Sequence, residues 1–508
     1  MIKKNIETKL NVQPIFIGFV HEYSYEGSCR FGTTPEELTP EYDAMMSQEL
    51  YEAFKIKLAE HTPDGVELFE PIYVEVNDWF LNKEDMYEKM AKNSDQVDLY
   101  LFDFQIARGF VYIEFAQRVN KPVCMIPHGC CEDTLNTAAL QARGREVYSF
   151  FDWEDFYGYI RALRTRKALR NTRVLVGSRF SSTKSFGATD NFVNLEEITN
   201  NFGVKFRNIS VHELMDQLHV VDPTTNPSLP GRKANNLTEE DVKKAEEIAD
   251  EFIANAKELR IDREMVVGTI KGYVLVQKLL DFYDCNAFTV PCPDLCSTRR
   301  LNEEKLTFCL THSLNIENGI PSACDLDFNS LLTQAVLENL SGKSVYMGNV
   351  NVFPLEDGHL PMVYPKFDDE AIQDIEDKTN LVSLFHATPT RKLKGMDGAL
   401  QPYDIDSFTY SGFGATVRYD FTQDAGQEIT LSRIAPDGKK IFAAKGVIVK
   451  GSGTPKSCGQ GVIFRVADNR DFYYKQCQFG CHLTLVYGDY IDDIKKFGEV
   501  MGLEVVTA

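Results

Sequence analysis

Short, nearly continuous apolar runs alternate with helical patterns in the first part of the chain, and this alternation constrains the fold most. The runs PIFIGFV, VDLYLFDF and KPVCMIP span residues 14–20, 97–104 and 121–127. Between the last two lies RGFVYIEFAQRVN, whose apolar residues recur at helical spacing. Strands that are apolar on both faces and alternate with helices are typical of a parallel sheet covered on both sides. The pattern therefore predicts a doubly wound α/β domain.

The pattern changes twice further along the chain. A new apolar run, TRVLVGSRF at residues 172–180, precedes a helical pattern and another strand-like run, which indicates a second α/β domain. After residue 353, β-rich segments separated by turn residues dominate, including the hairpin signal PDGKK, and a helical pattern at residues 489–501 closes the chain. We predict an α/β fold with two doubly wound α/β domains followed by a β-rich C-terminal domain. The predicted domains are 1–172, 173–352 and 353–508.

Net charge, cysteines and hydropathy limit the partners and the compartment. The 508 residues carry a formal charge of −21 at pH 7, and such an acidic surface repels nucleic acids and anionic membranes. No run of about 18 apolar residues occurs, so no transmembrane helix is expected. The N-terminal stretch MIKKNIETKLNV has no apolar signal-peptide core. We therefore expect a soluble cytoplasmic protein whose 12 cysteines are reduced thiols.

Residues 319–353 place two aspartates, one residue apart, before a helical pattern and a short strand. The helical pattern follows Asp327 and stops at Gly342, and the strand SVYMG then ends at Asn349. Asp325 and Asp327 therefore open a helix, where the macrodipole favours anions. In a βαβ unit, a helix N-terminus and the end of the next strand share the carboxyl edge of the sheet, where such proteins bind ligands. The three polar side chains are expected to converge on one ligand, unless the aspartates only cap the helix.

Three segments resemble the fucose/arabinose isomerase superfamily, in order along the chain. They are KGYVLVQKLLDFYDCNAFTVPCPDL, LNIENGIPSACDLDFNSLLTQAVLENLSGKSVYMGNV and QFGCHLTLVYGDYIDDIKKFGEVMGLEVV, and GFVYIEFAQRVNKPVCMIPHG is more weakly similar. The resemblance implies two α/β domains and a β-rich C-terminal domain, which agrees with the pattern above. It also implies an aldose–ketose isomerisation on a divalent manganese ion (Mn²⁺) and a homo-oligomeric ring, commonly a hexamer.

The same resemblance assigns roles to particular residues. In the superfamily, the metal is held by a carboxylate of an acid-x-acid motif, a second carboxylate at the next strand end and a histidine near the C-terminus. These positions correspond here to Asp325, with Asp327 as the second acid of the motif, to Asn349 and to His482. The chain departs twice, because Asn349 is an amide and Asp325 replaces the glutamate of fucose isomerases. The resemblance thus implies Asp325, Asn349 and His482 as metal ligands, with Asp325 and Asn349 at the catalytic positions.

The amide at Asn349 leaves open which group moves the proton. Transfer between C1 and C2 of a sugar needs a general base, and an amide oxygen can ligate a cation but cannot carry a proton. Glu356 and Asp357 in PLEDGH, and His359 in the same turn, are candidate replacements. We take Glu356 as the third candidate catalytic residue. The alternative for each is an ordinary solvated loop residue.

Three further residues are candidates for contacts with a sugar. In the superfamily, an N-terminal domain of a neighbouring subunit covers the active site, and the segment HEYSYEGSCRFG with Arg30 occupies a comparable position. Trp79, in NDWF, offers a ring that could reach the sugar. His386 lies in NLVSLFHATPTRK, which resembles the segment after the family's metal ligands. A surface arginine and a packed tryptophan are the alternatives, and the sequence does not identify the sugar.

Other kinds of site have weaker signals. The pairs CPDLC and CQFGC have three intervening residues and lack a second pair at structural-zinc spacing. HGCCED has no third group that would support a Cys/His nucleophile. The glycine-rich GSGTPKSCGQG lacks the strand-then-helix context of a phosphate-binding loop.

The sequence therefore favours a metal-dependent aldose–ketose isomerase that acts on a deoxyhexose or a pentose through an enediol. The expected cofactor is Mn²⁺ or another divalent cation, and the expected partners are a small sugar and further copies of the chain. A non-catalytic sugar-binding homologue of the same fold is one alternative. A related lyase or epimerase using the same enediolate chemistry is another.

Overall fold

The computed structural model describes residues 2–21, 32–77, 84–104, 109–179, 187–221, 235–296, 299–352, 372–408, 410, 412–453 and 458–508. The chain divides into two units: Thr8–Arg164, and Met1–Glu7 together with Thr165–Ala508. The predicted combination of parallel α/β sheets with a β-rich C-terminal region is confirmed. The finer partition at residues 172/173 and 352/353 stays a prediction. Within the described segments, no helix is long and apolar enough to cross a membrane.

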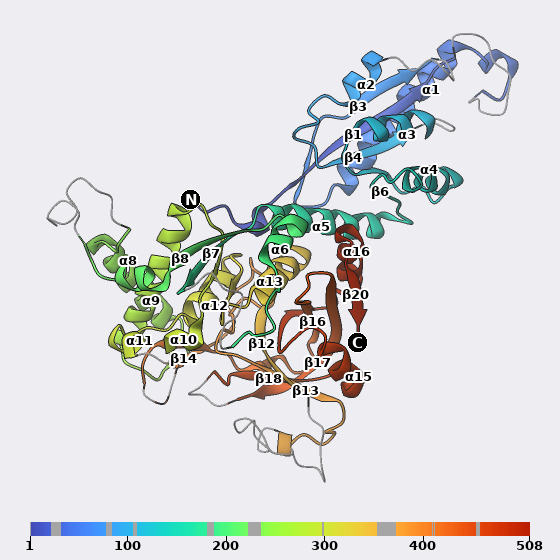
Figure 1. The fold of residues 1–508 in the computed structure, drawn as a ribbon. Coiled ribbons are helices and arrows are strands. Elements are labelled where there is room, and N and C mark those ends of the chain that lie inside the picture. Colours follow the sequence, from blue (N-terminus) through green and yellow to red (C-terminus); the bar gives the residue numbers. More distant parts are fainter. Residues whose placement is uncertain are drawn as a thin grey trace. The chain divides into compact units, whose positions relative to one another are not determined.

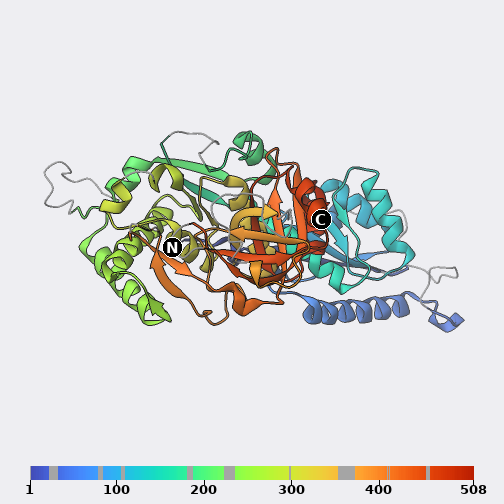
Figure 2. The same cartoon turned by 90° about the horizontal axis from the view of Figure 1, so that it is seen from below.

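The smaller unit is built on parallel strands. Its elements are β1 (Leu10–Phe19), η2 (Pro35–Glu37), α1 (Pro40–His61), β2 (Val66–Leu68), β3 (Ile72–Val76), α2 (Glu84–Met90), β4 (Leu99–Phe104), α3 (Gly109–Arg118), β5 (Val123–Met125), α4 (Cys131–Gln141), β6 (Val147–Tyr148) and most of α5 (Trp153–Arg170). The strand order is β2-β1-β4-β5-β6, and β3 also pairs with β1. The apolar runs noted above are β1, β4 and β5, and they form one buried core with α3. Figure 2 shows α1, in blue, as a long helix of this unit, and α1 packs against β1.

The larger unit begins with a second parallel sheet. Its first elements are η1 (Asn5–Glu7), β7 (Arg173–Ser178), α6 (Leu195–Phe202), β8 (Lys205–Ser210), α7 (Val211–Asp216), α8 (Glu239–Ala254), β9 (Glu258–Leu259), α9 (Arg263–Phe282), β10 (Ala287–Thr289), α10 (Cys292–Cys296), α11 (Arg299–Glu303), α12 (Cys309–Glu317), β11 (Ser322–Ala323) and α13 (Phe328–Ser341). The strand order is β11-β10-β7-β8, so the direction of strand addition reverses at β7. Ligands of open α/β sheets bind at the carboxyl ends of strands near such a reversal.

Antiparallel strands dominate the rest of this unit. The elements are β12 (Tyr346–Val352), β13 (Leu381–Phe385), β14 (Asp404–Ser407), β15 (Ala415–Arg418), η4 (Phe421–Asp424), β16 (Glu428–Ile434), β17 (Lys440–Ser452), β18 (Gly461–Arg465), α15 (Asn469–Gln476), β19 (His482–Tyr487), α16 (Ile491–Met501) and β20 (Glu504–Thr507). The main sheet has the order β16-β19-β12-β13-β18-β17-β20, and β16 also pairs with β17. Six strands therefore close into a ring. The helix α13 packs on β16 and β19, and Figure 1 labels α13 close to β16.

The position of β12 corrects one step of the sequence analysis. The strand that follows α13 was expected in a parallel βαβ unit, but β12 pairs antiparallel with β13 on one side and with β19 on the other. The parallel strand next to the aspartates is instead β11, a two-residue strand that ends just before them. Asp325 therefore lies at a carboxyl edge, as predicted, but this edge belongs to β11.

Local signals in the sequence agree with the elements found. The side chain of Asp327 caps α13 by accepting a hydrogen bond from the Ser330 N–H, and Gly342 ends the helix in the left-handed conformation, with φ 68°. The side chains of Thr238 and Asp241 form a capping box at the start of α8. The PDGKK turn joins β16 to β17 as a hairpin.

Candidate functional site

Three predicted site residues, Asp325, His386 and His482, lie together in the larger unit. The Nε2 atoms of His386 and of His482 each lie 3.5 Å from Oδ2 of Asp325, and all three side chains are buried. The two imidazole rings meet edge to face, with their centroids 5.5 Å apart. The other predicted site residues Arg30, Trp79 and Glu356, together with Asp357 and His359, lie outside the described residues.

The backbone at Asp325 is strained. Asp325 and Leu326 both have φ of 59°, a left-handed conformation that costs non-glycine residues free energy. Asn191 holds this turn from both sides, because its amide donates to the Leu326 carbonyl (2.6 Å) and accepts from the Phe328 N–H (2.8 Å). Gly187 lies against the Asp325 carboxyl group, so closely that an added Cβ would be 2.8 Å from its Cγ. The surrounding chain thus imposes one orientation on this carboxylate.

A buried polar network fixes His482. Its Nδ1 lies 2.8 Å from Oδ2 of Asp327, and the same oxygen accepts hydrogen bonds from Arg433 (2.8 Å) and from the Ser330 hydroxyl (2.9 Å). Arg433 also donates to the His482 carbonyl (3.1 Å) and pairs with Asp190 (3.2 Å). Asp327 therefore orients His482 and is not itself a candidate ligand, because its carboxylate already bonds to these groups.

The unpaired face of His482 decides what this arrangement can hold. Because an ionised Asp327 can only accept hydrogen bonds, Nδ1 of His482 carries the proton. In the neutral ring, Nε2 then presents a lone pair toward the Asp325 oxygen 3.5 Å away, and among the described residues this buried atom has no hydrogen-bond partner. Two acceptors facing each other require a proton or a cation. Carboxylate–histidine–metal arrangements have this form, so the residues present fit a divalent cation.

The protonation states follow from burial and from the charged neighbours. Burial acts to raise the pKa of Asp325, but His386 and His482 outweigh it and hold this pKa below its ordinary value. Burial likewise opposes ionisation of Asp327, yet Arg433 and His482 hold its pKa far below the ordinary range. For His482, burial lowers the pKa, and the carboxylates of Asp327 and Asp325 raise it above the ordinary value. Both carboxylates are ionised at neutral pH, and His482 readily takes up a positive charge between them.

Asn349 reaches this region through the register of the strands. It pairs with His482 across β12 and β19, and with Phe385, the residue before His386, across β12 and β13. Directly opposed residues in antiparallel strands lie about 5 Å apart. The Asn349 side chain is half-buried. Asn349 therefore brings an amide group opposite His482.

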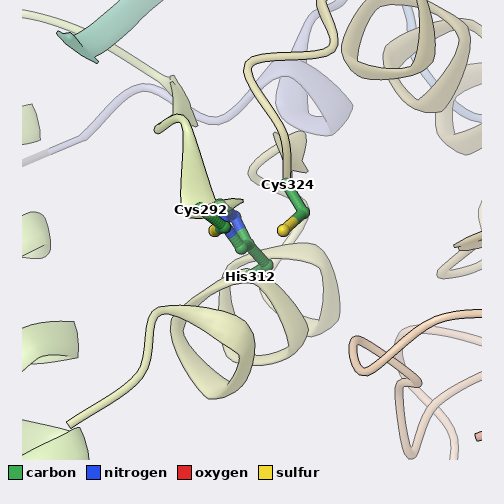
Figure 3. Close-up of side chains that lie close together, drawn as sticks. All are labelled: Cys292, His312 and Cys324. Atoms are coloured by element: carbon green, nitrogen blue, oxygen red, sulfur yellow. The ribbon is translucent and has the colours of Figure 1, made fainter. Parts of the chain in front are cut away.

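The structure adds a second cluster that the sequence analysis missed. Cys292, His312 and Cys324 are buried and lie close together, and Figure 3 shows the two cysteine side chains around the His312 ring. Burial, together with His386, lowers the pKa of His312 to about 3. Burial raises the pKa of the Cys324 thiol, and its neighbours Cys292 and Asp325 act in the same direction. The sequence signal was the pair CPDLC, but the partners of Cys292 are distant in sequence.

A polar cavity lies near His386. It has a volume of about 290 Å³ and is lined by Arg260, Asp404, Arg418, Tyr419, Asp420, Gly451, Ser452, Gly453 and Gln460. The Gln460 carbonyl accepts a hydrogen bond from the His386 N–H (2.9 Å), so one residue belongs to the cavity wall and also contacts the site. Charged and amide groups of this kind are the partners that sugar hydroxyls need.

Comparisons with known proteins add no family to this geometry, because no protein-family model and no curated protein matches the chain. A function for this chain is therefore inferred from the residues of the site and from the resemblance of the segments around Asp325 and His482 to sugar isomerases.

Proposed function

We propose that the protein is a metal-dependent aldose–ketose isomerase acting on a deoxyhexose or a pentose. The observation that carries the proposal is the buried gap between Nε2 of His482 and Oδ2 of Asp325, 3.5 Å apart and backed by Asp327. Such a pair suits a cation with mixed oxygen and nitrogen ligands. The resemblance of the segments around Asp325 and His482 to sugar isomerases supplies the reaction class.

The ligands proposed for the cation are Asp325 and His482, with the carbonyl oxygen of Asn349 as the third. Mn²⁺ or another divalent cation suits this set, because carboxylate and carbonyl oxygens are ligands for hard cations and imidazole is tolerated. When bound, the metal supplies Lewis acidity toward the O1 and O2 atoms of the sugar. Asp327 keeps the His482 ring oriented, with its hydrogen bond at Nδ1.

The proton transfer between C1 and C2 is assigned to a carboxylate. Asp325 is ionised and faces the histidines, so it can accept the proton, and Glu356 is the alternative base. His386 can donate a hydrogen bond to a sugar hydroxyl through the Nε2 that now faces Asp325. Arg30 and Trp79 are proposed to contact the sugar, as the resemblance implies.

A sugar-binding protein of the same fold is the second candidate, and Asn349 favours it. An enzyme of this class uses a second carboxylate for proton transfer, and an amide opposite His482 cannot serve in that way. The substitution Asn349→Asp separates the two candidates. A large activity gained from near zero would favour the binding protein, whereas little change would favour an enzyme adapted to the amide.

The test of the proposal is NMR of a panel of aldoses in D₂O, with manganese or with a chelator. We expect one sugar to exchange its C2 proton for deuterium and to yield a ketose only when manganese is present. Asp325→Asn should lower this rate about 10²–10⁴-fold, the usual contribution of an acid–base group, and His482→Gln should lower it by removing a proposed metal ligand. The exposed residues Asp397 and His212 provide the matched controls Asp397→Asn and His212→Gln, which should retain the rate.

Two results would count against the proposal. The proposed isomerase activity would be contradicted if a folded protein with manganese bound neither exchanges the C2 proton nor forms a ketose with any sugar. If the control variants lose as much activity as Asp325→Asn, the assignment of the active site to Asp325 and His482 would be contradicted. If a ketose forms but contains no deuterium, the isomerase activity would be retained. The proton could then not be transferred by a base that exchanges it with solvent.

A further inference from the structure

The cluster of Cys292, His312 and Cys324 is not used by the proposed reaction. Cys292 begins α10, with two residues between it and the end of β10, Cys324 directly follows β11, and His312 lies on α12. The two sulfur atoms and a ring nitrogen all lie within 4.8 Å of one another, and all three residues are buried. Neighbouring strands of a parallel sheet thus bring two thiols and an imidazole to one carboxyl edge.

The His312 ring is oriented as a ligand would be. Its Nδ1 lies 2.8 Å from the Ser322 hydroxyl oxygen, which also accepts a hydrogen bond from the Asn315 amide (3.1 Å). A donating Nδ1–H leaves the lone pair of Nε2 on the side of Cys292, whose sulfur is 3.7 Å away. Hydrogen bonds to the outer nitrogen of a histidine fix the tautomer and the ring at metal sites in this way.

The Asp325 carboxylate lies between this cluster and the site described above, and the ligand atoms of Cys324, Asp325 and His386 also lie within 4.8 Å of one another. Its Oδ1 lies 3.6 Å from the Cys324 sulfur, whereas its Oδ2 faces His386 and His482. The two oxygens of this carboxyl group therefore face different kinds of metal-ligand atom. Sulfur and one imidazole lie on the side of Oδ1, and imidazole and oxygen ligands lie on the side of Oδ2. Thiolates select soft and borderline cations, and oxygens select hard ones.

We propose that Cys292, His312 and Cys324 form a second metal site, for a soft or borderline cation such as Zn²⁺. Two thiolates balance the charge of Zn²⁺. Together with the imidazole they occupy three of the four positions of a tetrahedral site. Binding releases the two thiol protons, because thiolates are the ligands. Three protein ligands leave one position open, which is the composition of catalytic zinc sites rather than of closed structural ones. This site stands independently of the proposed isomerase activity.

The test replaces the metal with Co²⁺ in the full-length protein and records its absorption spectrum. Thiolate ligation produces an intense sulfur-to-cobalt charge-transfer band in the near ultraviolet, which an oxygen and nitrogen site cannot produce. We expect this band with an intensity for two thiolates, and Zn²⁺ should abolish it by competition. Cys292→Ser and Cys324→Ser should each weaken Zn²⁺ binding by more than the 10–100-fold that loss of a supporting hydrogen bond costs. Cys131→Ser, at an exposed cysteine of the smaller unit, should change nothing.

The outcomes separate this proposal from the proposed function. Absence of the band in the folded wild-type protein would overturn the site, as would an unchanged band in both cluster variants. A Cys292–Cys324 disulfide, detected by mass spectrometry in freshly purified protein, would also overturn it. If a serine variant fails to fold, His312→Gln is the substitute, and the wild-type band intensity alone still counts the thiolates. Manganese-dependent sugar exchange is measured separately and does not depend on these results.

Discussion

Asp327 and Arg433 form a deeply buried ion pair beside the site. Their side chains are almost wholly excluded from solvent, and Asp327 also receives hydrogen bonds from Ser330 and His482. Burying two charges is favourable only when their geometry is good and further hydrogen bonds satisfy them, as those of Ser330 and His482 do for Asp327. The pair therefore acts on stability and on the position of His482 together.

We predict that Asp327→Asn destabilises the protein by about 3–5 kcal/mol, because it leaves the buried Arg433 charge without its main partner. The pKa of Asp327 is lowered in the folded state, so its stabilising contribution exists above the unfolded pKa near 3.8 and is lost as the pH falls through the folded pKa. Guanidinium chloride unfolding at several pH values measures both effects. The control Asp397→Asn changes an exposed aspartate and should stay within about 0.5 kcal/mol. Equal stability of Asp327→Asn and this control would contradict the role of the pair.

Glu338 in α13 is a second buried ionisable residue, and its carboxyl group lacks a hydrogen-bond partner among the described residues. Its side chain is fully buried and neither carboxyl oxygen has a hydrogen bond, so burial raises its pKa well above 4.5. Its contribution to stability is therefore complete below the unfolded pKa and declines as the pH rises toward the folded pKa. Glu338→Gln should remove this decline and make the protein more stable than wild type at pH 8, measured by thermal unfolding at pH 5 and pH 8. Glu49→Gln, at an exposed glutamate, is the control, and a matching pH slope in the two variants would contradict the prediction.

The site residues differ in how far the sequence predicts them. Asp325 and His482 were predicted through resemblance, and the structure places them together. Cys292, His312 and Cys324 were not, because their proximity depends on which strands are neighbours in the sheet, and residue spacing does not contain that information. Arg433 lies in the strand EITLSRI, and no local signal in these residues indicates that its charge is buried against Asp327.

At the scale of elements, α13 shows how local chemistry positions the site. Asp327 begins the helix, Gly342 ends it, and the strained turn at Asp325 precedes it. Both ends were predictable, because capping residues act on their own helix. The pairing of the next strand, β12, was not predictable. A short apolar run in the sequence is compatible with a strand of a parallel sheet and with a strand of a closed antiparallel ring, so the sequence pattern does not distinguish them.

Two glycine substitutions separate a conformational requirement from a packing requirement. Gly342 has φ 68° and no atom within 4 Å of an added Cβ, so Gly342→Ala should cost about 1–2 kcal/mol from backbone strain alone. Gly272, inside α9, would place its Cβ 3.6–4.0 Å from Leu306 and Phe308, which is ordinary contact. Gly272→Ala should therefore stabilise the protein by about 0.5–1 kcal/mol, as alanine does in helices. Thermal unfolding measures both, and effects of the same sign would contradict this account.

At the scale of the whole molecule, we predict a homo-oligomer, following the resemblance to ring-forming sugar isomerases. Each 57.6 kDa chain carries a formal charge of −21, so the subunits repel one another at low ionic strength. Association should therefore strengthen as salt is raised toward physiological ionic strength. Sedimentation velocity should give a mass that is a multiple of 57.6 kDa, six times this mass for a hexamer. A monomer at every salt and protein concentration would contradict the prediction.

The most direct test of the account is anomalous X-ray diffraction from crystals grown with manganese. The account predicts an anomalous peak between Oδ2 of Asp325 and Nε2 of His482, within bonding distance of both atoms, with Asn349 facing it. The same crystals of the His482→Gln variant should lose the peak. Manganese found elsewhere, or a peak only among Cys292, His312 and Cys324, would contradict the assignment of the Asp325–His482 pair as the centre of a sugar isomerase.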